Sequence, residues 1–494
     1  MSPSEPQELR NYAGGEWRRS HASEYGEVRN PATDALLAKV PHTVASEVDE
    51  VVRAAADAFP DWRETPVGER VQPLFRLKAI LERELDTIAA TLVGECGKTF
   101  AEAKGELKRG IENVEVASGM PSLMQGVNNE DVARGIDEHM FRQPLGVVTA
   151  ITPFNFPGMI PLWFLPYAVA SGNCFVLKPS DRVPLTTQAI VRACEEAGFP
   201  PGVVNLVNGG RATVEALLDH PDVRAVSFVG STPVARAVYA RATAAGKRAQ
   251  CQGGAKNPAV VLPDAEMEMS TRILADSAFG CAGQRCLATS VVITVGEARE
   301  AFTERIVEDA ASRRVGYGLD DGVQMGPVIS RASRERVAGL VRSGVEEGAR
   351  IVVGGEPVEI DGYRNGYFFH PTVMDGVAPG STLASTELFG PVLSLMHADT
   401  LEQAIELVND RPFGNQACLF TSSGASARAF RHHVRAGNIG INLGVAAPMA
   451  YFPFSGFRES FFGDLHAQGA HGVEFYTETK VVIERWPSSW SRRF

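Results

Sequence analysis

The sequence has no apolar run long enough to cross a membrane and no excess of positive charge. Its formal net charge of −11 disfavours non-specific binding to nucleic acid or to anionic membranes. The first residues, Met1–Pro6, show neither the basic nor the apolar region of a secretory signal. We therefore expect a cytoplasmic protein with no nucleic-acid partner and no membrane partner.

Cysteine is also scarce, and its spacing excludes several site types. The seven cysteines form no C-x-x-C pair and no Cys/His pattern of a zinc site, so we expect no metal. An odd, widely spaced set of thiols fits a reducing compartment, in which most cysteines are small buried hydrophobic residues. These cysteines are Cys96, Cys174, Cys194, Cys251, Cys281, Cys286 and Cys418.

A chain of 494 residues is too long for one hydrophobic core, so two or more domains are expected. Short apolar runs alternate with helical patterns, which predicts parallel βαβ units and a doubly wound sheet. Ligands of such sheets bind beyond the carboxyl ends of the strands. The predicted strands are 146–151, 174–177, 203–207, 225–229, 260–262, 291–295, 351–353 and a β-rich tail at 473–483; the predicted helices are 43–63, 70–92, 99–116, 187–197, 212–218, 267–279, 298–314 and 331–347.

The stretch Gly283-Gln284-Arg285-Cys286 contains a candidate nucleophile. A neighbouring cation lowers the pKa of a thiol, so Arg285 predicts a lowered pKa for Cys286. Rapid alkylation of Cys286 near neutral pH would argue against a catalytically silent protein. The amide of Asn155, in Thr152-Pro153-Phe154-Asn155-Phe156-Pro157, is a candidate donor to an oxyanion. The plainer interpretations are a buried structural thiol and a turn residue.

Two further motifs indicate a nucleotide site, although the sequence has no G-x-G-x-x-G fingerprint near them. Lys178 and Asp181 follow a predicted strand, where they could meet ribose hydroxyls or phosphate. Gly230 and Ser231 join a predicted strand to the start of a helix, a typical phosphate position. Solvated loop residues and a capped helix are the plainer interpretations of these patterns.

Taken together, these motifs resemble the aldehyde dehydrogenase superfamily. The run Gln252-Gly253-Gly254-Ala255-Lys256-Asn257 is similar to the branch of methylmalonate-semialdehyde dehydrogenases that use coenzyme A, and the likeness spans residues 14–477. The resemblance implies an α/β fold with a Rossmann-type NAD-binding domain, an α/β catalytic domain and a β-rich oligomerisation arm. The implied boundaries are 1–122 and 144–252 for the NAD-binding domain, 253–443 for the catalytic domain, 123–143 and 473–494 for the arm, and 444–472 for a segment lining a substrate tunnel.

The resemblance also implies a role for each matching residue. Cys286 attacks the aldehyde, Asn155 stabilises the oxyanion, and hydride transfer to NAD leaves a thioester on Cys286. Arg109 and Arg285 hold the carboxylate of the substrate, and the protein is a dimer or tetramer. The residues implied to contact NAD are Phe154, Lys178, Asp181, Gly230, Ser231, Glu387 and Phe389. Asp181 is shorter than the glutamate common in the family, which leaves NADP open as an alternative to NAD.

Gln252 stands where hydrolytic aldehyde dehydrogenases carry a glutamate that activates water. An amide takes no proton near neutral pH, so acyl transfer to coenzyme A is favoured over hydrolysis. A hydrolytic enzyme with another base, and a catalytically silent member, are the alternatives. The segment Leu443–Pro448 lacks the proline-rich loop usual in the branch, so a different or longer semialdehyde is an alternative substrate. Malonate and methylmalonate semialdehyde are not separated, because they differ by one methyl group, worth only about 1–3 kcal/mol in a pocket.

Overall fold

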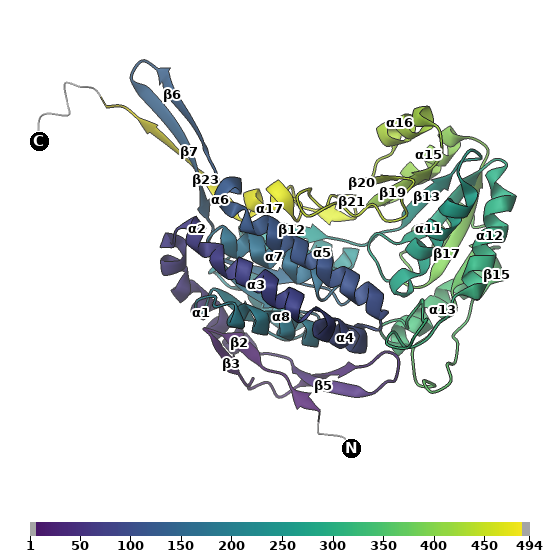
Figure 1. Ribbon diagram of the computed structural model, residues 1–494, viewed down its shortest axis with the longest axis horizontal. Coiled ribbons are helices and arrows are strands. Elements are labelled where there is room, and N and C mark those ends of the chain that lie inside the picture. The colour runs from purple at the N-terminus through teal and green to yellow at the C-terminus, as the bar shows by residue number, and fades with distance from the viewer. Residues whose placement is uncertain (1–5, 487–494) are drawn as a thin grey trace, which may run out of the picture.

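The computed structural model describes residues 6–486, which fold around two mainly parallel β-sheets with a separate three-stranded arm (Figure 1). Residues 487–494, which we assigned to the arm, lie outside the described residues. No helix within 6–486 is long and apolar enough to span a bilayer.

The first sheet has eight strands, of which β8 to β12 are parallel. Its central strands β8 and β9 are buried at every residue, because helices cover both faces; this explains their unbroken apolar runs. The strands in spatial order are β22 (Phe461–Phe462), β12 (Arg248–Gln252), β11 (Val223–Val229), β8 (Val147–Ile151), β9 (Cys174–Lys178), β10 (Val204–Leu206), β2 (Asn11–Ala13) and β3 (Glu16–Arg18).

The second sheet has seven strands, all parallel except β15 at one edge. Four of its strands, β16, β17, β19 and β20, were absent from the sequence prediction, and so were β2, β3, β12 and β22 of the first sheet. Strand β12 reads Arg-Ala-Gln-Cys-Gln, a polar run that gives no apolar signal although its last three residues are buried. The order is β15 (Arg350–Val353), β16 (Thr372–Asp375), β17 (Val392–Ala398), β14 (Thr289–Val295), β13 (Asn257–Val261), β19 (Gln416–Phe420) and β20 (Asn438–Ile441).

Most helices lie where the sequence predicted them, but one predicted helix is two helices in the structure. The single helix expected over 70–92 is two helices that meet at Glu84, which leaves the helical conformation at the end of α3. The longer helices are α1 (Ala45–Glu64), α3 (Gln72–Arg83), α4 (Leu85–Cys96), α5 (Phe100–Ser118), α7 (Met159–Ala170), α8 (Pro184–Glu196), α9 (Arg211–Asp219), α10 (Thr232–Ala244), α11 (Met267–Phe279), α12 (Ala298–Ser312), α13 (Arg331–Glu346), α15 (Leu401–Asn409) and α16 (Gly424–His433).

The arm consists of β6 (Val127–Ala133), β7 (Ile136–Pro144) and β23 (Thr477–Glu484), and it projects from the side of the first sheet (Figure 1). The β-rich tail expected at 473–483 begins later than predicted, because α17 (Gly469–Phe475) precedes β23. The remaining short elements are β1 (Gln7–Glu8), β4 (Tyr25–Arg29), β5 (Leu36–Pro41), α2 (Val67–Arg70), α6 (Met120–Leu123), the 3-10 turn η1 (Gly280–Gly283), α14 (Thr382–Ser385), β18 (Phe413–Gly414) and β21 (Phe457–Arg458).

The strand order of the first sheet locates its ligand site. From β8 the chain builds outward to β9 and β10, and then returns to place β11 and β12 on the other side of β8. The order therefore reverses between β8 and β11, and ligands bind at the carboxyl ends of strands beside such a reversal. The segments that follow β8, β9 and β11 contain Asn155, Asp181 and Ser231 respectively.

Candidate active site

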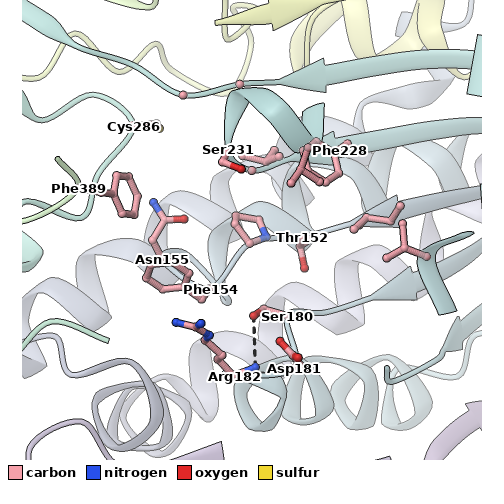
Figure 2. A pocket seen from close by; sticks show the side chains of 18 of the residues that line it. Thr152, Phe154, Asn155, Ser180, Asp181, Arg182, Phe228, Ser231, Cys286 and Phe389 are labelled. Carbon is pink, nitrogen blue, oxygen red and sulfur yellow. Dashed lines mark hydrogen bonds between the residues drawn. The ribbon is translucent and has the colours of Figure 1, made fainter. Parts of the chain in front are cut away.

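Two cavities meet at Cys286. The first, of about 600 Å³, is lined by every residue that we expected to contact a dinucleotide, together with Asn155 and Cys286. Figure 2 shows Cys286 and Phe389 toward one end of this cavity and Asp181 and Arg182 toward the other. The second cavity, of about 400 Å³, is lined by Cys286, Arg109 and Arg285. Cys286 can therefore be reached by two molecules from different directions.

A strained loop presents Cys286 to both cavities. Cys281 and Ala282 both have φ of +51°, a region that non-glycine residues adopt at an energetic cost. Gly283 has φ of +70°, and a Cβ there would lie 2.1 Å from the carbonyl oxygen of Gly390. The chain thus turns sharply before Cys286 and is closely packed at the turn.

The carbonyl group of Cys286 is fixed by two amide side chains. Asn257, at the start of β13, and Asn415 each donate to it through Nδ2 at 2.8 Å. Both donors come from the second sheet or the loop leading to it. The second sheet therefore sets the position of Cys286.

Asn155 faces the same loop from the first sheet. Its Nδ2 donates to the carbonyl oxygen of Gln284 at 3.0 Å, and the residue is 4% exposed. An amide nitrogen carries two hydrogens, so one remains for a ligand oxygen in the cavity that Asn155 shares with Cys286. The structure thus brings together the two residues expected to act on an aldehyde carbonyl.

Arg285 does not activate Cys286, and this prediction was wrong. Its Nε donates to Sγ of Cys281 at 3.2 Å, and its Nη2 pairs with Glu102 at 3.1 Å. Burial raises the pKa of the Cys286 thiol to about 12, and the nearby carboxylate of Glu387 raises it further. Adjacency in sequence did not place the guanidinium beside the thiol, because the two side chains point to different neighbours.

We therefore expect Cys286 to alkylate slowly in the protein without ligands. With a pKa of about 12, the rate of reaction with iodoacetamide should rise about tenfold per pH unit between pH 7 and pH 9.5, because only the thiolate reacts. Mass spectrometry of the modified peptide measures this rate, and the Cys286→Ala variant gives the background from the other thiols. A rate that levels off below pH 8 would contradict the raised pKa.

The far end of the first cavity has the features of a site for an adenosine diphosphate group. Lys178 ends β9, is 5% exposed, and has its pKa lowered to about 8 by burial. Ser231 is the first residue before α10, and its side chain makes no capping bond to that helix. The first N–H groups of α10 therefore stay available to phosphate.

The end near Cys286 is closed by two aromatic rings. Phe154 and Phe389 pack edge to face, with ring centroids 5.7 Å apart. Phe389 has φ of +53°, and Arg336 supports its strained segment by donating to the carbonyl oxygens of Glu387 and Leu388 at 2.7 and 2.6 Å. Both rings line the first cavity, which Cys286 also lines, and they give this end of it an apolar wall.

The second cavity is mostly apolar but includes charged residues along one wall. Arg109 donates to Glu112 at 2.6 Å and to the carbonyl oxygen of Pro448 at 2.5 Å. Val445, Ala447 and Pro448, from the segment expected to line a tunnel, also line this cavity. The remaining lining includes Phe156, Met159, Trp163 and Phe454. Each arginine thus already has a carboxylate partner, which a bound anion would have to displace.

Gln252 ends β12 and is 3% exposed. Neither its Oε1 nor its Nε2 has a hydrogen-bond partner within the described part of the chain. It lines neither of the two cavities, although its neighbours Gly253 and Gly254 line the first. No carboxylate base stands at this position.

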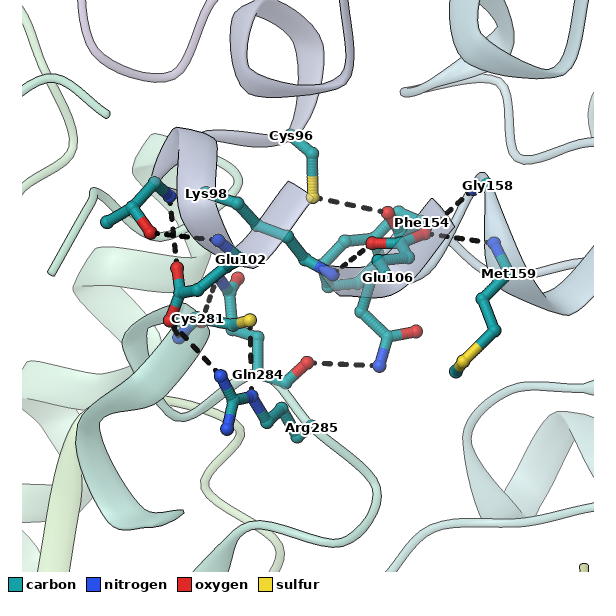
Figure 3. Close-up of polar contacts among 12 residues, drawn as sticks. Cys96, Lys98, Glu102, Glu106, Phe154, Gly158, Met159, Cys281, Gln284 and Arg285 are labelled. Atoms are coloured by element: carbon teal, nitrogen blue, oxygen red, sulfur yellow. Dashed lines mark hydrogen bonds and ion pairs between the residues drawn. The ribbon is translucent and has the colours of Figure 1, made fainter. Parts of the chain in front are cut away.

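Sequence reasoning missed several residues that hold the site together. The most important are Lys98, Glu102 and Glu106, which form a polar cluster beside Cys281 and Arg285 (Figure 3). A usable signal existed, because Glu102, Glu106 and Arg109 share one face of a helix that was predicted correctly. The roles of Asn257 and Asn415 had no local signal.

Comparison with known proteins identifies the family. The sequence profile of the aldehyde dehydrogenase family matches residues 17–482. The chain is 47% identical over 480 residues to malonate-semialdehyde dehydrogenase 2 of Geobacillus kaustophilus, covering 97% of this chain and 99% of that protein.

Two solved structures are very similar in fold. A structure of a methylmalonate-semialdehyde dehydrogenase from Oceanimonas doudoroffii superposes with a TM-score of 0.96 at 42% identity, covering 99% of this chain and 100% of the other. A putative methylmalonate-semialdehyde dehydrogenase from Sinorhizobium meliloti 1021, solved in complex with NAD, superposes with a TM-score of 0.97 at 38% identity. The match covers 99% of this chain and 100% of the other. With a profile match over nearly its whole length and relatives at this identity, the chain belongs to the aldehyde dehydrogenase family.

Proposed function

We propose that this enzyme oxidises malonate or methylmalonate semialdehyde with NAD, and transfers the decarboxylated acyl group to coenzyme A. The observation that carries the proposal is the position of Cys286 between two cavities, one sized for a dinucleotide and one bearing Arg109 and Arg285. The relatives named for malonate and methylmalonate semialdehydes support the substrate class. The product would be acetyl-CoA or propanoyl-CoA.

The first cavity fits NAD on the chemistry of its own residues. Asp181 and Glu387 are carboxylates at separate points of the wall, suited to accept hydrogen bonds from two ribose groups. The uncapped start of α10 borders the same cavity through Ser231 and suits a pyrophosphate. Thr152 Oγ1 is buried on this wall without a partner among residues 6–486, so it can bond to a ligand. Bound NAD would supply the hydride acceptor.

In the proposed reaction the Cys286 thiol first loses its proton to water in the first cavity, and the thiolate then adds to the aldehyde carbon and forms a thiohemiacetal. The free N–H of Asn155 and the backbone N–H of Cys286 would stabilise the resulting oxyanion. Loss of hydride leaves a thioester on Cys286. The aromatic pair Phe154 and Phe389 excludes water from one side of the reacting carbon.

Decarboxylation follows from the thioester. Its carbonyl group lies two carbons from the substrate carboxylate, so it accepts the electron pair released when carbon dioxide leaves. The side chains of Phe156, Trp163 and Phe454 give the second cavity an apolar wall, where a carboxylate loses hydration. A proton then restores the acyl group, and the coenzyme A thiol displaces it from Cys286.

Dependence on coenzyme A tests the proposal. We expect NADH formation from malonate semialdehyde to stall after about one turnover per active site without coenzyme A and to continue with it, because Gln252 cannot activate water. Stopped-flow absorbance measures the first turnover, and mass spectrometry identifies the thioester product. Sustained oxidation to a free acid without coenzyme A would overturn the acyl-transfer step.

Hydrolysis is the second candidate, because one carboxylate other than residue 252 is placed to assist it. Glu387 lines the same cavity as Cys286, and burial raises the pKa of its carboxyl group. A carboxylate of raised pKa is a better base for water. Its Oε1, however, accepts the backbone N–H of Ala255 at 2.8 Å, which reduces its basicity.

Arg109 is proposed to recognise the substrate carboxylate. Arg109→Ala should raise KM for malonate semialdehyde by about 10–100-fold, the effect of losing a charge-assisted hydrogen bond worth about 1.5–3 kcal/mol. KM for propanal, which has no carboxylate, should change less than threefold. Steady-state NADH formation measures both. An equal rise for the two substrates would mean that Arg109 only supports the loop through Pro448.

The arm is proposed to join copies of the enzyme into a dimer or tetramer. Its strands carry exposed apolar side chains, among them Val127, Phe141, Val481 and Ile483, each at least 50% exposed. Exposed apolar patches of this kind are typical of contact surfaces.

A further inference from the structure

Helix α5 contacts all three loops that build the active site. Glu102, Glu106 and Arg109 are spaced four and three residues apart and therefore lie on one face of the helix. Each reaches a different segment: Glu102 the loop before Cys286, Glu106 the segment after Asn155, and Arg109 the segment at Pro448. Figure 3 shows the first two contacts side by side.

Glu102 binds the loop before Cys286 at Cys281, one of its two strained residues. Its Oε1 accepts the backbone N–H of Cys281 at 2.7 Å and Nη2 of Arg285 at 3.1 Å. Its Oε2 accepts the backbone N–H of Thr99 at 3.0 Å, which anchors the carboxylate to the start of α5 in a capping box. Three donors thus hold one carboxylate, and two of them belong to the loop that ends at Cys286.

The loop needs such support. Residues held in the left-handed region cost about 1–3 kcal/mol each and persist only where the surroundings fix them. Cys281 is one of two consecutive residues with φ of +51°, and its N–H is the group that Glu102 accepts. The Arg285 guanidinium also fills the space above Gly280, where a Cβ would meet Nη2 at 2.5 Å.

Glu106 holds the segment that carries the amide donor. Its Oε1 accepts the backbone N–H groups of Gly158 and Met159 at 2.7 and 3.1 Å, at the start of α7. Its Oε2 pairs with the buried Lys98, whose Nζ lies 3.5 Å from the centroid of the Phe156 ring. The Phe156 ring is therefore held by Lys98, just before α5, and the turn at Gly158 is held by Glu106 of α5.

We propose that Glu102 is a positioning residue, and that with Glu106, one helical turn away, it sets the separation of the Cys286 thiol from the Asn155 amide. The inference rests on the roles proposed above for Cys286 and Asn155. One rigid helix holds both loops, although the loops belong to different sheets. Misplacing reacting groups by about 1 Å costs on the order of 100-fold in rate.

The test compares Glu102→Gln with Glu115→Gln, a matched change at an exposed position of the same helix. A glutamine at 102 has one acceptor oxygen and cannot hold three N–H donors. We expect kcat to fall about 10–100-fold for both malonate semialdehyde and propanal, with little change for Glu115→Gln. Glu102→Asp should be impaired as well, since the shorter side chain keeps the charge but loses the reach.

A double-mutant cycle with Asn155→Ala separates alignment from general stability. If Glu102 acts through the Cys286–Asn155 separation, its effect on kcat should shrink to less than threefold in the Asn155→Ala background. Equal effects in both backgrounds would overturn the proposal. So would full rescue by Glu102→Asp, or a change confined to KM of the carboxylated substrate, since either would indicate a role of charge alone.

The melting temperature of every variant is measured in parallel. If Glu102→Gln does not fold, Glu102→Asp takes its place in the cycle, with the same expected and contrary results. Failure of the proposed function is recognised separately: it would show as turnover by Cys286→Ala, whatever the substitutions at 102 do.

Discussion

Cys286→Ala is expected to lower turnover by at least about 10⁴-fold, because no thiol remains to form the thioester. NAD should still bind with unchanged affinity, since the adenosine end of the first cavity is formed by Lys178, Asp181 and Ser231. Initial rates of NADH formation and calorimetric titration with NAD measure the two quantities.

The control for this variant is Cys194→Ala. Cys194 is a buried thiol of α8 that lines neither cavity, so its replacement should leave kcat unchanged. Residual activity of Cys286→Ala above a few per cent of the wild type would show that another group attacks the aldehyde. Such activity would contradict the proposed mechanism. It would also show that the loop at 280–286 is not essential for catalysis.

Asn155→Ala should lower kcat by about 10²–10³-fold, the usual cost of losing one oxyanion donor. KM for the semialdehyde should change little, because the bond to the oxyanion forms fully only in the transition state. Steady-state kinetics at saturating NAD and coenzyme A separate the two parameters.

A second variant distinguishes donation from packing. Asn155→Asp keeps the size of the side chain but has no N–H, so it should be at least as slow as Asn155→Ala. Near wild-type turnover by the aspartate variant would show that Asn155 only fills space beside Gln284. In that case the backbone N–H of Cys286 would be the remaining donor.

The strands and candidate site residues that the sequence predicts are each detectable from a short stretch of the chain. The apolar runs that become β8, β9 and β11 are detectable because their strands are buried on both faces. The residues at the ends of those strands follow from the rule that parallel sheets bind ligands at their carboxyl ends. Cys286, Asn155 and Gln252 are each recognisable inside a short motif.

The orientation of side chains was not predictable in the same way. Arg285 is adjacent to Cys286 in sequence, yet its guanidinium bonds to Cys281 and Glu102. The pKa of Cys286 follows burial and the approach of Glu387, which is 101 residues away and comes from the loop before β17. Neither effect is a property of the motif that contains the thiol.

Sequence alone therefore determined the fold class and the family, and it supplied the candidates for the reacting groups, because those depend on burial patterns and short motifs. Tertiary structure alone decided which charges face each other and which helix aligns the loops. Glu102 and Cys281 are 179 residues apart, and only the packing of α5 against the loop of the second sheet brings their atoms to 2.7 Å. Electrostatic and hydrogen-bond energies depend on such distances, which residue order does not fix.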